Sequence, residues 1–69
     1  MEHQPVVSSN LASVAYDRRE GLLEVDFNSG YTYQYQGVPP GVVRGLLRAP
    51  SAGKYFHRNV RYSYQYERL

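Results

Sequence analysis

The sequence predicts an α+β domain: a three-stranded antiparallel β-meander covered on one face by two short helices, with an extended, tyrosine-rich C-terminal segment. Two observations support this fold class. Between residues 11 and 36, apolar and polar side chains alternate in three short runs separated by turn-forming residues, as in hairpin-connected strands. Between residues 42 and 60, apolar residues recur instead every three or four positions, as in amphipathic helices.

Length and composition limit the kind of protein that this chain forms. The 69 residues suffice for one domain with a thin core, and no cysteine is present for disulfides or a Cys-based zinc site. Residues 1–8 have no periodicity and contain Pro5, so we expect a flexible lead-in and a single domain over residues 9–69. The N-terminus lacks the features of a signal peptide, and no apolar run approaches the roughly 20 residues of a membrane span. The sequence therefore predicts a cytoplasmic protein without a membrane segment.

Three short strands are expected in the first half of the chain. They cover residues 11–16, 22–27 and 31–36. A charged turn closed by a glycine joins the first strand to the second. An Asn-Ser-Gly connection joins the second strand to the third, with Gly30 at the position that tolerates a positive φ. These short turns predict an antiparallel meander.

The alternation gives the predicted meander one apolar face and one polar face. The expected apolar positions are Ala12, Val14, Tyr16, Leu23, Val25, Phe27, Tyr31, Tyr33 and Tyr35. The opposite face carries Glu24, Asp26, Thr32 and Gln34. Because an apolar sheet face has to be buried against another layer, we expect the helices to cover it.

The first helix is expected between two proline signals. Pro39 and Pro40 suit a helix start, and Pro50 ends the helix. Its expected core positions are Val42, Val43, Leu46 and Leu47. Glycine weakens a helix by about 1 kcal/mol relative to alanine. Either packing on the sheet compensates for this loss, or Gly45 permits a close approach to the sheet.

A second short helix is expected after Ser51, which suits an N-cap. Ala52, Phe56 and Val60 recur every four residues and should face the core. In the tail that follows, tyrosines alternate with polar residues. This pattern fits either a fourth strand or an extended segment laid over the domain.

Several motifs together resemble the KTSC domain. They are SSNLASVAYD, then LLEVDF, SG, YTYQY and GVP, and finally PSAGKYFHRNVR with its S-x-G-x-x-F-x-x-N run and a tyrosine-rich tail. The resemblance spans residues 8–68, nearly the whole chain. It implies a small module that occurs at the C-terminus of some lysyl-tRNA synthetases and as free-standing proteins. Association with a tRNA enzyme implies RNA binding by context alone.

Charge is distributed unevenly along the chain. Residues 1–40 have two basic and five acidic residues, whereas residues 41–69 have six basic and one acidic. A basic half predicts an anionic partner. We expect a nucleic acid, with RNA before DNA because the resemblance is to a module attached to a tRNA enzyme. The candidate nucleic-acid-binding residues are Arg44, Arg48, Lys54, Arg58, Arg61, Tyr62 and Tyr64. The alternative is that these cations are only the solvated sides of two helices, and that the tyrosines serve the small core.

Two other anion-binding modes are less favoured by the sequence. Stacking of bases on the strand tyrosines would need the face that the helices should cover, and Glu24 and Asp26 on the other face would repel phosphate. The Ser51–Gly53 turn could offer backbone N–H groups to an anion. It lacks the glycine-rich loop of a phosphate cradle, so an ordinary N-cap is the better interpretation.

Catalytic signals are weak. Glu24 and Asp26 could pair on one strand face, but alternating acids on an exposed strand are typical of solvation. His57 has no neighbouring acid to orient it, His3 lies in the expected lead-in, and Asn59 suits the end of the second helix. No metal-ligand spacing is present. We therefore expect a monomeric, non-catalytic binding module without a cofactor or a metal. The alternative function is a protein-interaction module that uses exposed tyrosines and an edge strand.

Overall fold

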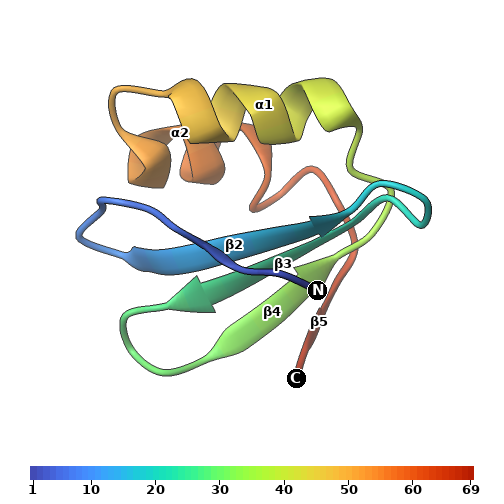
Figure 1. Cartoon of the computed structure of the whole chain (residues 1–69), viewed down its shortest axis with the longest axis horizontal. Coiled ribbons are helices and arrows are strands. Elements are labelled where there is room, and N and C mark those ends of the chain that lie inside the picture. Colours follow the sequence, from blue (N-terminus) through green and yellow to red (C-terminus); the bar gives the residue numbers. More distant parts are fainter.

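The structure is a computed structural model that describes residues 1–69, and its two helices lie on one side of an antiparallel sheet (Figure 1). The elements in chain order are β1 (Gln4–Pro5), β2 (Leu11–Asp17), β3 (Leu22–Phe27), β4 (Thr32–Tyr35), α1 (Pro40–Arg48), α2 (Ala52–Asn59) and β5 (Tyr66–Arg68). The sheet order is β1-β2-β3-β4-β5, with every neighbouring pair antiparallel. The predicted α+β class, with an antiparallel sheet and two helices, is confirmed.

The sheet has five strands, so the prediction of three was wrong in this detail. β1 arises within the expected lead-in and pairs Gln4 with Val14 on β2. β5 resolves the alternatives left open for the tail, because Tyr66 pairs with Tyr35 on β4. Both added strands are edge strands of two and three residues. Such short runs have too few residues for alternation to identify them.

A β-bulge in β2 changes which side chains face the core. Leu11 pairs with Phe27 and Ser13 with Asp26, so Ala12 is the extra, unpaired residue of the bulge. Strict alternation placed Leu11 on the same side as Ser13. The bulge instead puts Leu11 in the core together with Val14, and the predicted inward position of Ala12 was wrong.

The core lies between the sheet and the helices. Its buried members are Leu11, Val14, Leu23, Val25, Tyr35, Val38, Val43, Leu46, Ala52, Phe56 and Val60. The predicted core positions of α2 are therefore confirmed, as are Val43 and Leu46 of α1. Leu47 was expected in the core but is 42% exposed. The buried stripe of α1 is too narrow to include it.

The two helices approach each other at Gly45. A Cβ atom at this position would lie 2.7 Å from Tyr55 Cζ and 2.9 Å from Tyr55 Cε2. Gly45 therefore does permit a close approach, but of an aromatic ring from α2 rather than of the sheet.

Local hydrogen bonds fix the ends of α2 and the hairpin. The Ser51 hydroxyl accepts a hydrogen bond from the Lys54 N–H at 3.3 Å, which confirms the predicted N-cap. The Asn59 amide donates to the Tyr55 carbonyl at 3.1 Å within the last turn of the helix. Gly30 has a φ of 99°, as expected for the Asn-Ser-Gly connection.

Neither helix is long and apolar enough to cross a membrane.

Candidate functional site

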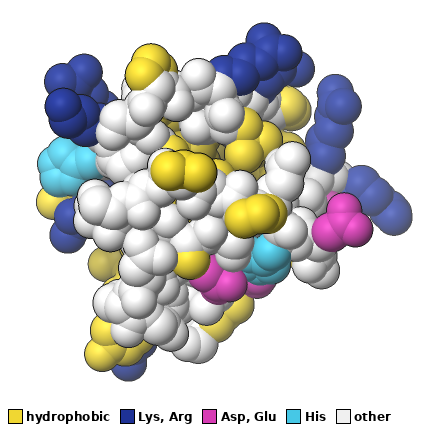
Figure 2. All heavy atoms as spheres, turned by 60° about the vertical axis from the view of Figure 1, so that its left-hand side comes forward, with side chains coloured by type: hydrophobic (Ala, Val, Ile, Leu, Met, Phe, Trp, Pro, Cys, Tyr) yellow, Lys and Arg dark blue, Asp and Glu magenta, His cyan; other side chains and the backbone are white.

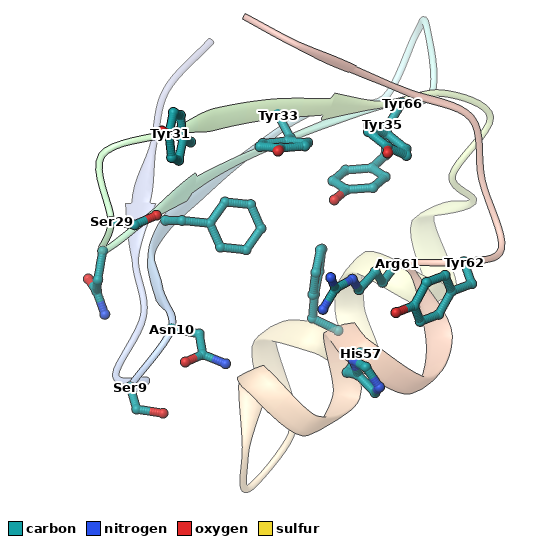
Figure 3. A pocket seen from close by; sticks show the side chains of 13 residues that line it. Ser9, Asn10, Ser29, Tyr31, Tyr33, Tyr35, His57, Arg61, Tyr62 and Tyr66 are labelled. Carbon is teal, nitrogen blue, oxygen red and sulfur yellow. The ribbon is translucent and has the colours of Figure 1, made fainter.

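A hollow opens between the sheet and the end of α2, and aromatic side chains from several elements line it (Figure 3). It has a volume of about 530 Å³. We call it the aromatic hollow. Its aromatic residues are Phe27, Tyr31, Tyr33, Tyr35, Phe56, Tyr62 and Tyr66. Its polar residues are Ser9, Asn10, Asn28, Ser29, His57 and Arg61.

The hollow exists because the helices cover only one end of the tyrosine face. Tyr35 is buried beneath Phe56, whose ring centroid lies 5.4 Å from its own. Tyr31, at the other end, is 53% exposed. The prediction that the helices cover all three strand tyrosines was therefore wrong for Tyr31. Phe56 is the one large apolar side chain that α2 directs at the sheet, and it does not reach that far.

Packing among the rings holds the walls of the hollow in place. Tyr33 is central: its ring is stacked with Tyr35 at 6.4 Å and meets Phe27 edge-on at 5.5 Å. The ring centroid of Tyr66, on β5, lies 5.5 Å from that of Tyr33. Such contacts add to the stability that burial provides and restrict the orientations of the rings. The hollow is therefore a preformed aromatic surface.

Arg61 brings a positive charge into the aromatic hollow. Its backbone N–H donates to the Phe56 carbonyl, which positions the residue just after α2. Figure 3 shows its side chain directed into the hollow below Tyr35. The guanidinium carbon lies 5.2 Å from the centroid of the Tyr62 ring, a cation–π distance. At the far end of the tyrosine row, the guanidinium carbon of Arg68 lies 5.0 Å from the Tyr31 centroid.

The environment of the hollow alters the ionisation of one tyrosine. Burial raises the pKa of Tyr35 to about 12, and the nearby Tyr33 hydroxyl adds to this effect, while the charge of Arg61 opposes it. Tyr35 is therefore a neutral wall of the hollow at physiological pH.

The cations near the hollow have no acidic partners. The carboxylates that lie within 4.0 Å of a basic side chain are Glu24 and Asp26, both beside His3, and none of the eight Lys and Arg residues lies that close to a carboxylate oxygen. No Asp or Glu lines the hollow. The Arg61 charge is therefore not neutralised within the chain.

A second hollow adjoins the first and is entirely polar. It shares Ser9, Asn10 and His57 with the aromatic hollow and has a volume of about 440 Å³. Its remaining lining residues are Ser51, Gly53, Lys54 and Arg58. The two hollows together place aromatic rings and three cationic side chains along one continuous surface.

The structure brings only some of the sequence-predicted site residues together. Lys54, Arg58, Arg61 and Tyr62 line the two hollows. Arg44 and Arg48 project from α1 and line neither, and Tyr64 packs against the core. On the face shown in Figure 2, Lys and Arg side chains stand at separate places near the outline instead of forming one patch.

Sequence reasoning missed much of the lining. Phe27 and Tyr33 were assigned to a covered face, and Asn10 carries no signal in the sequence, whereas the tail from Tyr62 to Tyr66 was expected to contribute contacts. The alternating tyrosines were visible in the sequence. The point along the row at which the helices stop covering these tyrosines was not visible, because it depends on how the helices pack.

The polar face of the sheet carries a separate hydrogen-bonded network. His3 bonds to Ser13 through Nδ1 at 2.9 Å and to Glu24 through Nε2, so this residue is tied to the sheet. Thr32 donates to Asp26. This bond, with help from His3 and Ser13, holds the pKa of Asp26 below its usual value of 3.8 despite the opposing effect of partial burial. These acids are thus partnered within the sheet, and neither hollow includes them.

Comparison with known proteins gives the family. The model of the KTSC domain matches residues 7–64. The chain belongs to the KTSC domain family. This confirms the resemblance noted in the sequence. A KTSC domain protein from Yersinia pestis has a crystal structure that superposes with a TM-score of 0.93 at 33% identity, covering 99% of this chain and 96% of that one.

Relatives of this KTSC domain occur in two settings. An uncharacterized protein from Stutzerimonas stutzeri is 45% identical over 58 residues, which are 84% of this chain and 82% of that protein. A lysine–tRNA ligase from Nostoc punctiforme is 33% identical over 61 residues, or 88% of this chain and 11% of the ligase. The match therefore spans about a tenth of the ligase and about four fifths of the Stutzerimonas stutzeri protein.

Proposed function

We propose that this KTSC domain is a small, non-catalytic, cytoplasmic module that binds single-stranded nucleic acid, RNA before DNA. One observation carries the proposal: the aromatic hollow and the polar hollow adjoin, so that tyrosine rings, Arg61, Lys54 and Arg58 share one surface without a carboxylate. Stacked bases and neutralised phosphates are the two contacts that proteins use to bind single strands.

The aromatic hollow supplies the stacking contacts. Base–aromatic stacking contributes about 1–3 kcal/mol per base and tolerates any sequence. Tyr62 and Tyr66 are 76% and 58% exposed, so their rings are accessible to a base. The bases would lie against the uncovered end of the sheet's tyrosine face, and not against its acidic face.

The cations supply the phosphate contacts. Lys54, Arg58 and Arg61 have no acidic partner to displace, so binding an anion costs no internal ion pair. Each phosphate contact releases counterions and makes the affinity depend on salt. The preference for RNA over DNA rests on the lysine–tRNA ligase relatives, whose name contains a tRNA substrate.

A protein-interaction module is the second candidate, because exposed tyrosines also suit a protein interface. The exposed tyrosines Tyr31, Tyr62 and Tyr66 favour it. The sheet edges do not, since β1 and β5 offer only two and three residues for strand addition. The absence of carboxylates around the cations favours a polyanion.

The test is an amide-resolved NMR titration with a short single-stranded RNA, the matched DNA and tRNA, at low and at moderate salt. We expect shifts at residues lining the two hollows, and an affinity that falls with a log–log slope of about 0.7 per phosphate contact. The double variant Lys54→Glu/Arg58→Glu should lose binding. The control Arg18→Glu/Arg19→Glu makes the same charge change in the exposed β2–β3 turn and should retain most of it.

An absence of shifts at low salt, where attraction to phosphate is strongest, would contradict the proposal. Equal losses in both double variants would mean that net charge, and not this surface, drives binding. A partner pull-down would then test the protein-interaction candidate.

A further inference from the structure

The aromatic hollow has the dimensions of a site for one small molecule. Its volume of about 530 Å³ falls within the range of roughly 300–1,000 Å³ that is typical of small-molecule sites. A duplex presents no free base faces, whereas a single unstacked base does. The walls of the hollow therefore suit one planar group better than a helical surface.

The charge of the hollow selects an anionic occupant. Arg61 is directed into it, has no acidic partner, and faces no carboxylate among the lining residues. His57 lies beside it at the border with the polar hollow, and its ring meets Tyr62 edge-on at 5.6 Å. A negatively charged group beside Arg61 would find cations on the side of the polar hollow as well.

The polar lining suits the edge of a base. The Asn10 side-chain amide makes no hydrogen bond within the chain, although its backbone N–H donates to the Ser8 hydroxyl. Figure 3 shows Tyr31 and Tyr33 on one side of the hollow and Asn10 and Arg61 on the opposite side. A carboxamide offers a donor and an acceptor side by side, which is the pattern that asparagine uses to pair with a base edge.

We propose that the aromatic hollow is a receptor for a single unpaired nucleotide, with the base on the aromatic wall of the hollow, its edge toward Asn10, and the phosphate beside Arg61. This proposal rests on the proposed function, since it names the unit of the strand that the hollow recognises. The aromatic walls, the unpaired guanidinium and the free carboxamide together match a planar base that carries a phosphate. An acidic peptide would satisfy the guanidinium but not the planar walls and the carboxamide together.

The experiment measures binding of AMP, CMP, GMP and UMP by NMR, with ribose 5-phosphate and inorganic phosphate as probes that lack a base. We expect the nucleotides to shift resonances of the hollow and to bind at least tenfold more tightly than ribose 5-phosphate. Replacing one nucleotide of a bound oligonucleotide by an abasic unit should weaken binding by a similar factor.

Two variants test the named contacts. Asn10→Asp keeps the shape of the side chain but adds a charge that repels phosphate, and Arg61→Gln removes the cation. Each should weaken nucleotide binding at least tenfold. The controls are Gln4→Glu on β1 and Arg44→Gln on α1, which make the same charge changes outside both hollows and should bind as the parent does. Well-dispersed spectra of all four variants confirm that they are folded.

The outcomes separate the two proposals. If oligonucleotides bind but ribose 5-phosphate binds as tightly as the nucleotides, the nucleotide receptor is wrong and the proposed function stands. If nucleotides bind with the expected variant effects but oligonucleotides do not, the receptor stands for free nucleotides and the proposed function is wrong. If neither binds at low salt, both are wrong.

Discussion

The ring of Tyr55 on α2 lies against the backbone of Gly45 on α1, in the space that a Cβ atom at position 45 would occupy. Such a Cβ atom would be 2.7 Å from Tyr55 Cζ, a distance that real Cβ atoms essentially never show. The interhelical contact therefore requires glycine, even though glycine costs the helix about 1 kcal/mol relative to alanine.

Gly45→Ala should destabilise the domain, because the ring is rigid and has to move as a whole. Overpacking of this kind costs about 1–3 kcal/mol, which outweighs the gain in helix propensity. Urea denaturation monitored by circular dichroism measures the change. The control is Gly41→Ala, where the nearest atom, Arg44 Nη2, is 4.0 Å away, and this variant should gain up to about 1 kcal/mol. Two variants of equal stability would show that Tyr55 does not need the space.

The raised pKa of Tyr35 predicts a loss of stability in strong base. Its folded-state pKa of about 12 lies above the value of 10.0 for an exposed tyrosine. Below pH 10 Tyr35 keeps its proton in both the folded and the unfolded chain, so it does not reduce the free energy of unfolding. Between pH 10 and pH 12 only the unfolded chain ionises, so the free energy of unfolding falls by about 3 kcal/mol from this group.

Denaturant titrations at several pH values between 9 and 12 check this expectation. Tyr35→Phe should flatten the pH dependence relative to the parent, and Tyr31→Phe is the control for the loss of a tyrosine hydroxyl at an exposed position. If Tyr35→Phe follows the same profile as the parent, another group causes the loss.

The Thr32–Asp26 hydrogen bond predicts a stability change in acid. The pKa of Asp26 is lower in the folded state than in the unfolded state. Ionised Asp26 therefore stabilises the fold above the pKa of the unfolded state, and this stabilisation disappears as the pH falls through the pKa of the folded state. Thr32→Val removes the donating hydroxyl and should raise the pKa of Asp26, moving acid unfolding to higher pH. Thr32→Ser keeps a hydroxyl and should stay close to the parent. NMR of the Asp26 side-chain carboxyl resonance as a function of pH measures this pKa directly. An unchanged titration midpoint in Thr32→Val would show that the Thr32 hydrogen bond does not lower the pKa of Asp26.

The hydrogen bond between Tyr16 and Val38 is partly buried, and its contribution to stability can be predicted. Its hydroxyl donates to the carbonyl of Val38, a residue that is 1% exposed and joins the sheet to α1. Tyr16→Phe leaves that carbonyl without this donor and should cost about 1–3 kcal/mol. Tyr31→Phe makes the same chemical change at an exposed hydroxyl and should cost less than about 0.5 kcal/mol. Similar thermal denaturation midpoints for the two variants would contradict this assignment.

Local patterns were sufficient for the parts of the fold whose signals lie within a few residues. The alternation of β3, the positive φ of Gly30 and the Ser51 cap depend only on neighbours, and all three were predictable. The bulge at Ala12 was not, because an extra residue in one strand is defined by its partner strand. The edge strands were missed for a related reason: they are strands because β2 and β4 offer free edges beside them.

The candidate site was predictable as a set of charges but not as a cavity. The spacing of Lys54 and Arg58 on one helix face follows from the sequence. That Arg61 points toward tyrosines from β4 and β5 depends on the extent of the helical layer, which ends before Tyr31. The size of a thin cover on a small sheet is a property of packing and cannot be obtained from periodicity.

The last strand, β5, follows both helices in the sequence, and its position affects the order in which the domain folds. β5 pairs with β4 only after both helices, so the pair Tyr35–Tyr66 closes a loop far longer than the hairpins that form the rest of the sheet. Long loops form slowly and short edge elements open first. We therefore expect the amides of β5 to exchange with deuterium well before those of β2 and β3. Since Tyr66 lines the aromatic hollow, this wall of the hollow would form last and open first, while the rest of the domain remained folded.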